Sequence, residues 1–403
     1  MSVFQRIGVI GGGPAGALAA AEFARAGRDV LLFDEKLAWE KPCGGGLTDK
    51  ALARWPFLRD AQVERNWVSD CELIAPSGRR VQFPLERPIA IFSRLKLNGL
   101  LLDRARDAGS KLLRERVLQI DGDAGGWLIR TASGSYSADF IVLAAGARNS
   151  LRARFTAALG PENFMVAAGY YIPGNNRTVQ IEFLKDLHGY IWIFPRADHF
   201  SAGICGRMQG KSTAELRRTL EDSLPEFGLS PDGASFYAHI IPSLTPDALR
   251  NTSFAGNGWA MIGDAAGFVD AITGEGLYYA LRSAELLTKA LLADAPEQYS
   301  GVVKRDFLPE LEHAARIADR FYGGEWMAGP VVERMIQLTQ SSARFREIMR
   351  DLFSGAQEYS NLRQRVYDQI PRIAMEATMS TLWNTLGRRG ASRRRSLGSL
   401  EAR

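Results

Sequence analysis

The sequence predicts an α/β fold made of a Rossmann-like unit, an inserted mixed or antiparallel β-sheet and a C-terminal helical region. Three observations predict it. An apolar run breaks into glycines and continues as an alanine-rich segment over residues 7–26. Aromatic and β-branched residues crowd residues 164–207, and helical spacing prevails from Asp306 onward. With 403 residues, the chain is long enough for two or three domains.

Charge and cysteine content exclude several classes of protein. Residues 388–403 carry six arginines and one glutamate, whereas residues 1–387 balance at 44 basic and 44 acidic side chains. A body without excess basic charge argues against nucleic-acid binding. Three cysteines, in neither a disulfide nor a metal-type pattern, predict a cytoplasmic protein without a metal site. We find neither a signal peptide nor the roughly 20 apolar residues that a membrane-spanning helix needs.

The N-terminal unit begins with a strand, a glycine turn and a helix. Gly11 permits the sharp turn, Gly13 lets the backbone approach a phosphate, and Gly16 lets helix and strand pack closely. About 20 residues later, Asp34 ends the second strand, where an acidic side chain accepts ribose hydroxyls, and Glu35 follows it. The pattern predicts a site for FAD or NAD, with these contacts at the turn: Gly11, Gly13, Pro14, Ala15 and Gly16.

A glycine-rich loop follows the second strand. Residues 41–46, Lys-Pro-Cys-Gly-Gly-Gly, stand where a plain NAD dehydrogenase would normally continue into another short helix. Backbone at Gly44 and Gly45 can pass close to a flat ring, which favours FAD over NAD. Cys43 is then the candidate for a catalytic side chain beside the flavin, and the alternative is a small side chain that fills a tight turn.

Residues 68–92 interrupt the N-terminal unit, and the elements that follow them are expected to belong to that unit again. Residues 68–92 alternate and contain Pro84, which predicts short antiparallel strands. Residues 95–108 are predicted as a helix with Arg94 at its entrance. Further strands of the first unit are expected near residues 112–120, 127–131 and 138–146.

Residues 164–207 predict a second sheet. Within it, Tyr190, Trp192 and Phe194 alternate at period two, so all three are expected on one face of a strand. Two interpretations stay open: a core packed between sheet and helix, or an apolar substrate cavity. A helix is expected to follow at about 212–227.

A second glycine turn lies far along the chain. Residues 259–267 read as a strand and a turn, and residues 273–276, Thr-Gly-Glu-Gly, open a helix with one apolar face. Asp264 can accept ribityl hydroxyls of a flavin. The amides of Gly274 and Gly276 can face the flavin pyrimidine edge, where negative charge accumulates on reduction.

These patterns divide the chain as follows. We expect a discontinuous FAD-binding domain, a substrate domain, a C-terminal helical region and a basic disordered tail. The FAD-binding domain comprises residues 1–67, 93–160 and 250–300, and the substrate domain comprises residues 68–92 and 161–249. The helical region spans residues 301–387, and the tail spans residues 388–403.

Together the motifs resemble the geranylgeranyl reductase family of flavoproteins, which has the p-hydroxybenzoate-hydroxylase-type fold. Four features carry the resemblance over most of the chain: the first glycine turn with Asp34, the 41–46 loop, Tyr190-x-Trp192-x-Phe194-Pro195, and Gly263-Asp264-Ala265-Ala266-Gly267 with its Thr-Gly-Glu-Gly continuation. The resemblance implies FAD as cofactor, an FAD-contacting Arg94 and a prenyl substrate at the aromatic strand. It also implies reduction of carbon–carbon double bonds in an isoprenoid or prenyl lipid.

Alternatives remain at three points. The same scaffold serves flavin-dependent monooxygenases, hydroxylases or halogenases, and a prenyl-lipid carrier without catalysis is a second alternative. The electron donor is left open between NADPH and ferredoxin. Ala145-Gly146 replaces the usual Asp-Gly pair after the returning strand, and this replacement argues against direct docking of a nicotinamide. Residues 372–395 combine an apolar stripe with arginines, which indicates either peripheral membrane contact or a helix packed on the body before a disordered tail.

Overall fold

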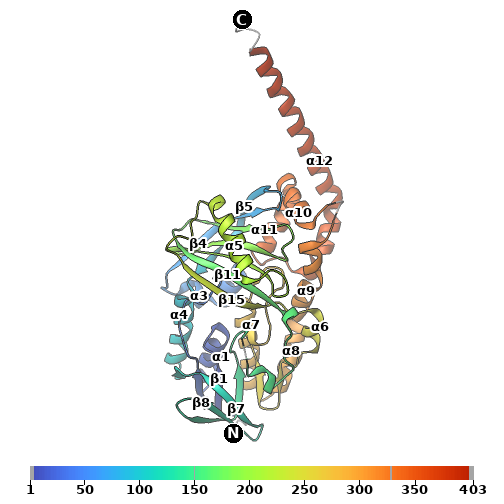
Figure 1. The fold of residues 1–403 in the computed structure, drawn as a ribbon. Coiled ribbons are helices and arrows are strands. Elements are labelled where there is room, and N and C mark those ends of the chain that lie inside the picture. The colour runs from blue at the N-terminus through green and yellow to red at the C-terminus, as the bar shows by residue number, and fades with distance from the viewer. Residues whose placement is uncertain (1–3, 149, 327–328, 399–403) are drawn as a thin grey trace.

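The computed structural model describes residues 4–148, 150–326 and 329–398. Within these residues, the chain forms three β-sheets, of six, eight and three strands. Figure 1 shows the N-terminal strands at the base of the molecule, the larger sheet above them and the C-terminal helices along one side. This arrangement is the predicted α/β fold, with a Rossmann-like unit, an inserted sheet and a helical C-terminal region.

The six-stranded sheet forms the Rossmann-like unit. Its strand order is β16-β17-β10-β1-β2-β6; the strands from β17 to β6 run parallel, and β16 pairs antiparallel at the edge. Its inner strands are apolar and buried, as expected for a parallel sheet covered on both faces. The bounds are β1 Arg6–Ile10, β2 Asp29–Phe33, β6 Lys111–Leu113, β10 Phe140–Leu143, β16 Ala255–Gly256 and β17 Trp259–Met261.

Three helices and a small sheet cover the Rossmann-like unit. Helix α1, Pro14–Arg25, packs against α4, Arg94–Asp107, and against α7, Leu277–Leu292. The three-stranded sheet contacts β1 and β10, and a Cβ on Gly8 would lie only 2.4 Å from Cδ1 of Ile129. Glycine at this position therefore lets the small sheet approach closely. Its strands are β7 Val117–Asp123, β8 Gly126–Thr131 and β9 Ser135–Ala138.

The eight-stranded sheet is mixed. Its strand order is β15-β11-β14-β13-β12-β4-β5-β3, with β12 parallel to β4 and the other pairs antiparallel. The segment 65–92 thus joins the sheet formed by residues 164–242. The bounds are β3 Gly46–Leu47, β4 Arg65–Ile74, β5 Arg80–Phe92, β11 Phe164–Pro173, β12 Thr178–Glu182, β13 Gly189–Pro195, β14 His199–Arg207 and β15 Ser235–Pro242.

The strands predicted in residues 68–92 are antiparallel, as expected, but the expectation that they are short is wrong. Strands β4 and β5 span 10 and 13 residues, and Pro84 lies inside β5 rather than at its end. Pro84 pairs with Asp70, where the register shifts at a bulge after Val68. Proline is tolerated at a bulge because the ladder of hydrogen bonds is already interrupted there.

The two faces of the eight-stranded sheet have different coverings. Ile191 and Ile193 pack with α5, Thr213–Ser223, on one face. Phe83 and Ile91 pack with the C-terminal helices around Ile336 on the other. The sheet therefore separates a closed core under α5 from a face that turns toward the C-terminal region.

The remaining helices are mostly C-terminal. The predicted helix at about 212–227 is α5 followed by a 3-10 turn. The other bounds are α2 Asp49–Arg54, α3 Pro56–Asp60, α6 Pro246–Asn251, α8 Tyr299–Asp306, α9 Leu308–Gly323, α10 Val331–Ser341, α11 Ala343–Phe353 and α12 Tyr359–Gly398, with 3-10 turns at Arg152–Arg154, Pro161–Asn163, Leu224–Phe227, Gly263–Ala265 and Pro296–Gln298.

Helix α12 differs from the expected disordered tail at 388–403. Its backbone is helical through Gly398, with Pro371 inside it, and Figure 1 shows it extending away from the body. Residues 388–398 contain arginine, leucine, serine, alanine and two glycines without a proline, so each residue keeps its amide donor for the helical hydrogen bonds. Residues 399–403 lie outside the described residues. Among the described helices, none combines the length and apolar character needed to cross a bilayer.

Candidate active site

A cavity of about 840 Å³ connects the Rossmann-like unit with the eight-stranded sheet and the C-terminal helices. The first glycine turn lines one part of it, and apolar side chains of β12, α9, α11 and α12 line another. The cavity gathers most of the predicted site residues, namely Gly11, Gly13, Pro14, Ala15, Asp34, Cys43, Gly44, Gly45, Arg94, Tyr190, Trp192, Phe194, Asp264, Gly274 and Gly276.

The first glycine turn has the geometry of an anion site. Gly11 has φ +110°, and a Cβ there would lie 2.3 Å from the carbonyl oxygen of Ala144. Gly13 faces open space, since a Cβ would meet no atom within 4 Å. As N-cap of α1 it offers no side chain to the first amides of the helix, so these amides stay available to a ligand. Gly16 acts in packing, because its Cβ would lie 1.9 Å from the carbonyl oxygen of Gly11.

Asp34 supports the turn as well as lining the cavity. Its Oδ2 accepts the amide of Gly12 at 2.7 Å, and its Oδ1 accepts the amides of Lys36 and Leu37 at 2.8 and 2.7 Å. Glu35, in contrast, is exposed and lies 3.9 Å from Arg116 on the surface. The structure therefore brings Asp34 to the cavity and leaves Glu35 outside its lining.

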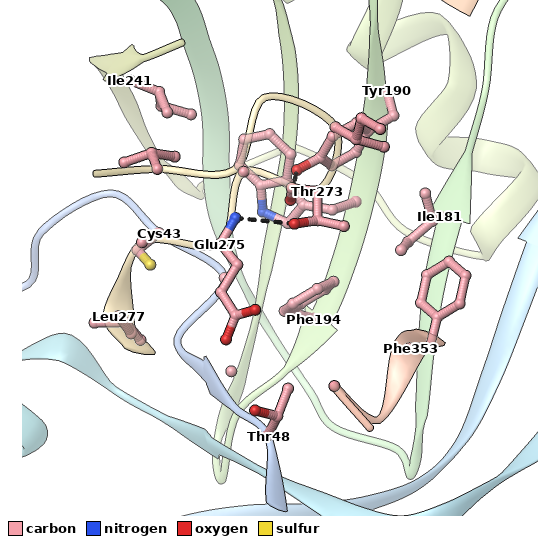
Figure 2. A pocket seen from close by; sticks show the side chains of 18 of the residues that line it. Cys43, Thr48, Ile181, Tyr190, Phe194, Ile241, Thr273, Glu275, Leu277 and Phe353 are labelled. Atoms are coloured by element: carbon pink, nitrogen blue, oxygen red, sulfur yellow. Dashed lines mark hydrogen bonds between the residues drawn. The ribbon is translucent and has the colours of Figure 1, made fainter. Parts of the chain in front are cut away.

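The loop of Cys43 is anchored by residues that the sequence did not single out. Arg196, fully buried, forms an ion pair with Glu40 and donates a 2.6 Å hydrogen bond to the carbonyl of Cys43. The hydroxyl of Ser201 donates to the same carbonyl at 3.0 Å. A Cβ on Gly44 would lie 2.5 Å from the ring of Phe194. The loop is thus held from beneath by β13 and β14, while Cys43 faces the cavity (Figure 2).

Arg94 lies at the start of α4 and is 3% exposed. Its Nη2 donates to Asn98 at 3.3 Å, and its Nε is buried without a hydrogen-bond partner among the described residues. A buried guanidinium with a free donor at the cavity wall fits an anionic ligand, because an unpaired buried donor is costly.

The second glycine turn meets the loop of Cys43 through an ion pair. Lys41 Nζ lies 2.8 Å from Asp264 Oδ2, and a Cβ on Gly276 would lie 3.3 Å from Asp264 Oδ1. Burial alone would raise the pKa of Asp264, but the ammonium group of Lys41 outweighs it, so the pKa lies below its usual value. Gly263 contacts the first turn, since its Cβ would lie 3.0 Å from Ala15.

The aromatic residues of β13 share one face, as predicted. Tyr190, Trp192 and Phe194 all line the cavity, while Ile191 and Ile193 point to the core under α5. The hydroxyl of Tyr190 donates a hydrogen bond to the carbonyl of Thr273, and Figure 2 shows this contact joining the strand to the second turn. The three side chains therefore line the cavity, and Trp192 also packs in a buried cluster with Cys205 and Tyr237.

Sequence reasoning missed part of the cavity. His239 of β15 lines it with Nε2 buried and without a partner among the described residues, and burial lowers the pKa of His239 to about 4. Glu275 was read only as part of the turn motif. The apolar end of the cavity was also missed; the amphipathic spacing in the C-terminal helices was its one signal in the sequence. The residues of this apolar end include Ile181, Phe183, Phe321, Phe345, Met349, Leu352, Phe353, Leu362 and Val366.

The two turns fit a flavin dinucleotide. Gly13 leaves room for a phosphate, Arg94 offers an unpaired donor, and Gly274 has φ +70° at an uncapped helix start. A charged phosphate and a polarised ring edge are the groups that such donors recognise.

Comparison with known proteins agrees with this geometry. Residues 9–39 match the model of the NAD(P)-binding Rossmann-like domain. A geranylgeranyl diphosphate reductase of Synechocystis sp. is 25% identical over 94% of this chain and 98% of its own length. A menaquinone reductase of Mycolicibacterium smegmatis is 26% identical over 83% of this chain and 90% of its own length.

Solved structures share the fold. A geranylgeranyl bacteriochlorophyll reductase-like protein of Thermoplasma acidophilum superposes with a TM-score of 0.75 at 18% identity, covering 91% of this chain and 98% of its own. A flavin-dependent brominase superposes with a TM-score of 0.65 at 17% identity, covering 92% and 99%.

The chain is therefore similar in fold to flavin-dependent enzymes and in sequence to reductases. The resemblance to geranylgeranyl reductases is confirmed along nearly the whole chain.

Proposed function

We propose that the protein is an FAD-dependent reductase of carbon–carbon double bonds in an isoprenoid or prenyl-derived substrate. The observation that carries this proposal is the single cavity that runs from the glycine turns to an apolar end. One part offers amides and charged groups of the glycine turns to a dinucleotide, and the other is lined mostly by apolar side chains, with His313, Arg320 and Arg363 among them. Two relatives of the chain, a geranylgeranyl diphosphate reductase and a menaquinone reductase, support an apolar substrate.

The apolar end suits a long hydrocarbon chain. Phe183, Phe353 and Val366 contribute walls from β12, α11 and α12. Burial of a prenyl chain among them stabilises binding by roughly 25 cal/mol per Å² and needs few polar partners. The loop of Cys43 meets the second glycine turn through the pair of Lys41 and Asp264, so substrate and cofactor would meet near Cys43.

Each part of the site has an assigned task in this proposal. Gly11, Gly13 and Ala15 would hold the pyrophosphate, Asp34 the adenosine ribose, and Asp264 the ribityl chain. The amides of Gly274 and Gly276 would face the pyrimidine edge, with Arg94 completing the anion site and Gly44 and Gly45 passing beneath the ring. When bound, reduced FAD supplies a hydride. The chain itself orients the prenyl group with Tyr190, Trp192 and Phe194 and excludes water, because its apolar walls surround the reacting carbons.

Cys43 and the electron donor complete the proposal. The thiol of Cys43 faces the cavity, where it would tune the flavin or help deliver a proton. If Cys43→Ser keeps both FAD and full turnover, the catalytic role of the thiol is wrong. The donor is NADPH or ferredoxin; Ala145 and Gly146 line the cavity without a charged side chain, which weakens the case for direct nicotinamide docking.

We also propose that the C-terminal segment 372–395 contacts a membrane surface. Met375 and Met379 are 57% and 60% exposed on α12, so the body does not cover them. Tyr367 and Ile370 of the same helix are exposed and line the cavity, which supports entry of a lipid substrate beside α12. The segment's side chains beyond residue 380 lie outside the described part, but its sequence adds arginines that anionic lipid attracts.

Cosedimentation with vesicles tests the membrane proposal. Full-length protein and a truncation after Gly387 are compared on anionic and zwitterionic vesicles. We expect the truncation to lose binding to the anionic vesicles; equal binding of the two proteins would reject the proposed role of the arginines.

An anaerobic reoxidation experiment tests the enzymatic proposal. FAD-loaded protein is reduced with dithionite, freed of excess reductant and mixed with geranylgeranyl diphosphate without oxygen. Substrate-dependent return of the oxidised flavin spectrum is expected from a reductase. A monooxygenase would show no return until oxygen is admitted, and a carrier would bind no FAD.

A further inference from the structure

Glu275 occupies a particular position in the second glycine turn. It lies between Gly274 and Gly276, immediately before α7, and its amide donates to the hydroxyl of Thr273 at 3.2 Å. In Figure 2 its carboxyl group points into the cavity, in the view between Cys43 and Leu277 on one side and Phe194 on the other. The turn therefore presents backbone amides and a carboxyl group at the same place.

The carboxyl group of Glu275 has no structural partner. None of the described residues donates a hydrogen bond to it or forms an ion pair with it. Asp270, in the same turn, is used differently, since its Oδ1 accepts the amides of Ile272 and Thr273, both at 2.8 Å. Asp270 thus holds the turn together, and Glu275 is left free for a ligand.

The surroundings raise the pKa of Glu275 toward neutral pH. Burial raises the pKa of Glu275 to about 7, the charge of Asp270 adds to the rise, and the ammonium group of Lys50 on α2 opposes it. Other titratable side chains that line the cavity from neighbouring elements include Lys41, Cys43, Tyr190, Asp264 and Tyr359. A carboxylic acid with a pKa near the working pH is suited to give and regain a proton.

Other carboxyl groups that line the cavity are already engaged. Asp34 is bound by three backbone amides, and Asp264 is paired with Lys41. Tyr190 donates its proton to the carbonyl of Thr273, and His239, whose pKa is lowered, carries no proton to spare at neutral pH. Among the described carboxyl groups of the cavity lining, Glu275 is the one whose proton is uncommitted.

We propose that Glu275 is the acid that protonates the substrate when the double bond is reduced. This inference rests on the proposed function. One alkene carbon receives a hydride from the reduced flavin, the π bond breaks, and its electron pair takes the proton of the Glu275 carboxyl group at the neighbouring carbon. The products are the saturated carbon pair, oxidised flavin and the Glu275 carboxylate, which regains a proton from water that reaches the cavity.

Three variants test the assignment: Glu275→Gln, Glu275→Asp and, as a control, Glu297→Gln. The Gln variant keeps the shape and loses the acidic proton, the Asp variant keeps the acid on a shorter side chain, and Glu297 lies outside the cavity lining. All three should retain FAD. With reduced protein and geranylgeranyl diphosphate under anaerobic conditions, we expect reoxidation to slow by about 100-fold or more in Glu275→Gln at unchanged KM, with partial recovery in Glu275→Asp.

Two pH titrations complete the test. The wild-type reoxidation rate should fall as pH rises through about 7, because the acid is then ionised, whereas Glu275→Gln should show no such step. Independently of turnover, the absorbance of bound oxidised FAD should shift with a midpoint near pH 7 in the wild type, and this shift should be absent in Glu275→Gln.

The outcomes separate the two proposals. An active wild type with a Glu275→Gln rate within threefold of it overturns the role of Glu275 and leaves the reductase intact. Loss of the rate together with loss of FAD, or a spectral step that persists in Glu275→Gln, also overturns that role. A wild type that is never reoxidised by a prenyl substrate overturns the proposed function and this inference together.

Discussion

The guanidinium group of Arg196 donates a 2.6 Å hydrogen bond to the carbonyl of Cys43, across 153 positions of sequence. Arg196 follows the last residue of β13, the strand that carries the aromatic wall of the cavity. Its ion pair with Glu40 holds the other end of the same loop. The aromatic wall and the cysteine loop are therefore fixed to each other as one unit.

Replacing Arg196 by methionine should destabilise the protein by about 3–5 kcal/mol, because it leaves the Glu40 carboxylate partly buried without its cation. Burial tends to raise the pKa of Glu40, but Arg196 and hydrogen bonds from Ser93 and two amides outweigh it and lower the pKa below its usual value. This stabilisation is present above the unfolded pKa and is lost as pH falls through the folded pKa. The difference in the free energy of unfolding between wild type and Arg196→Met, measured by urea denaturation, should therefore be smaller at pH 4 than at pH 7.

A double variant controls for lost packing. Glu40→Gln combined with Arg196→Met removes both charges and should recover part of the stability at pH 7. The ion pair does not stabilise the loop if the double variant is no more stable than Arg196→Met alone and if the stability difference between wild type and Arg196→Met does not depend on pH.

The glycine turns and the aromatic strand were predictable, whereas their anchoring was not. Gly11 and Asp34 lie in a local pattern whose spacing follows from strand and helix geometry. The pairings of Arg196 with Glu40 and of Lys41 with Asp264 depend on which strands become neighbours in a mixed sheet. A single sequence carries no signal for that choice, because charged residues are common in every loop.

Alanine at two glycines of the first turn should separate folding from cofactor binding. Gly13 has φ −67° and an open side, so Gly13→Ala should fold with wild-type stability while its methyl group occupies the proposed phosphate position. We expect FAD affinity to fall by more than about 100-fold, since charge-assisted bonds to two amides are worth about 3 kcal/mol. Thermal unfolding without FAD and FAD titration measure the two effects.

Gly11→Ala is the matched comparison. Its positive φ and the 2.3 Å approach to Ala144 should cost about 1–3 kcal/mol of stability in the absence of FAD. Equal FAD affinity of Gly13→Ala and wild type would contradict the assignment of this turn to the pyrophosphate.

Lys41→Met should expose the electrostatic cost of burying Asp264. Without the ammonium group, burial dominates and raises the pKa of Asp264, so the variant should lose about 1–3 kcal/mol at pH 7. Because the folded state then favours the protonated acid, part of the loss should be recovered as pH falls toward 5. Chemical denaturation at several pH values measures this. The stability of the double variant Lys41→Met/Asp264→Asn should not show this pH dependence. If the stability lost in Lys41→Met is the same at every pH, the ion pair of Lys41 and Asp264 is not its cause.

Val366→Trp should shorten the apolar end of the cavity. Val366 lies on α12 and lines the cavity. A larger side chain there should displace two or three buried methylenes of a long substrate, at about 0.8 kcal/mol each, and lower kcat/KM for geranylgeranyl substrates by about 10- to 50-fold. Geranyl substrates should be affected less. Leu118→Trp, at a position 58% exposed on β7, is the control, and an equal effect of both substitutions would contradict this location of the chain.

The lining of the apolar end shows where sequence reasoning stopped. Val366, Met349 and Phe353 belong to helices whose apolar faces could equally have packed on a closed core. The extent of the cavity is decided by how α11 and α12 lie against β4, β5 and β12, which is a tertiary arrangement. The same holds for Glu275, whose spacing in the turn was visible but whose free carboxyl group was not.

Product mass under strictly anaerobic conditions shows directly whether the protein reduces carbon–carbon double bonds. Dithionite-reduced, FAD-loaded protein is incubated with a panel of prenyl diphosphates, prenyl alcohols and prenylated quinones, and the extracted products are analysed by mass spectrometry. We expect the products to gain two hydrogens per turnover without oxygen. Unchanged substrates under these conditions, with oxygen or halogen incorporated only when air and halide are supplied, would contradict this expectation.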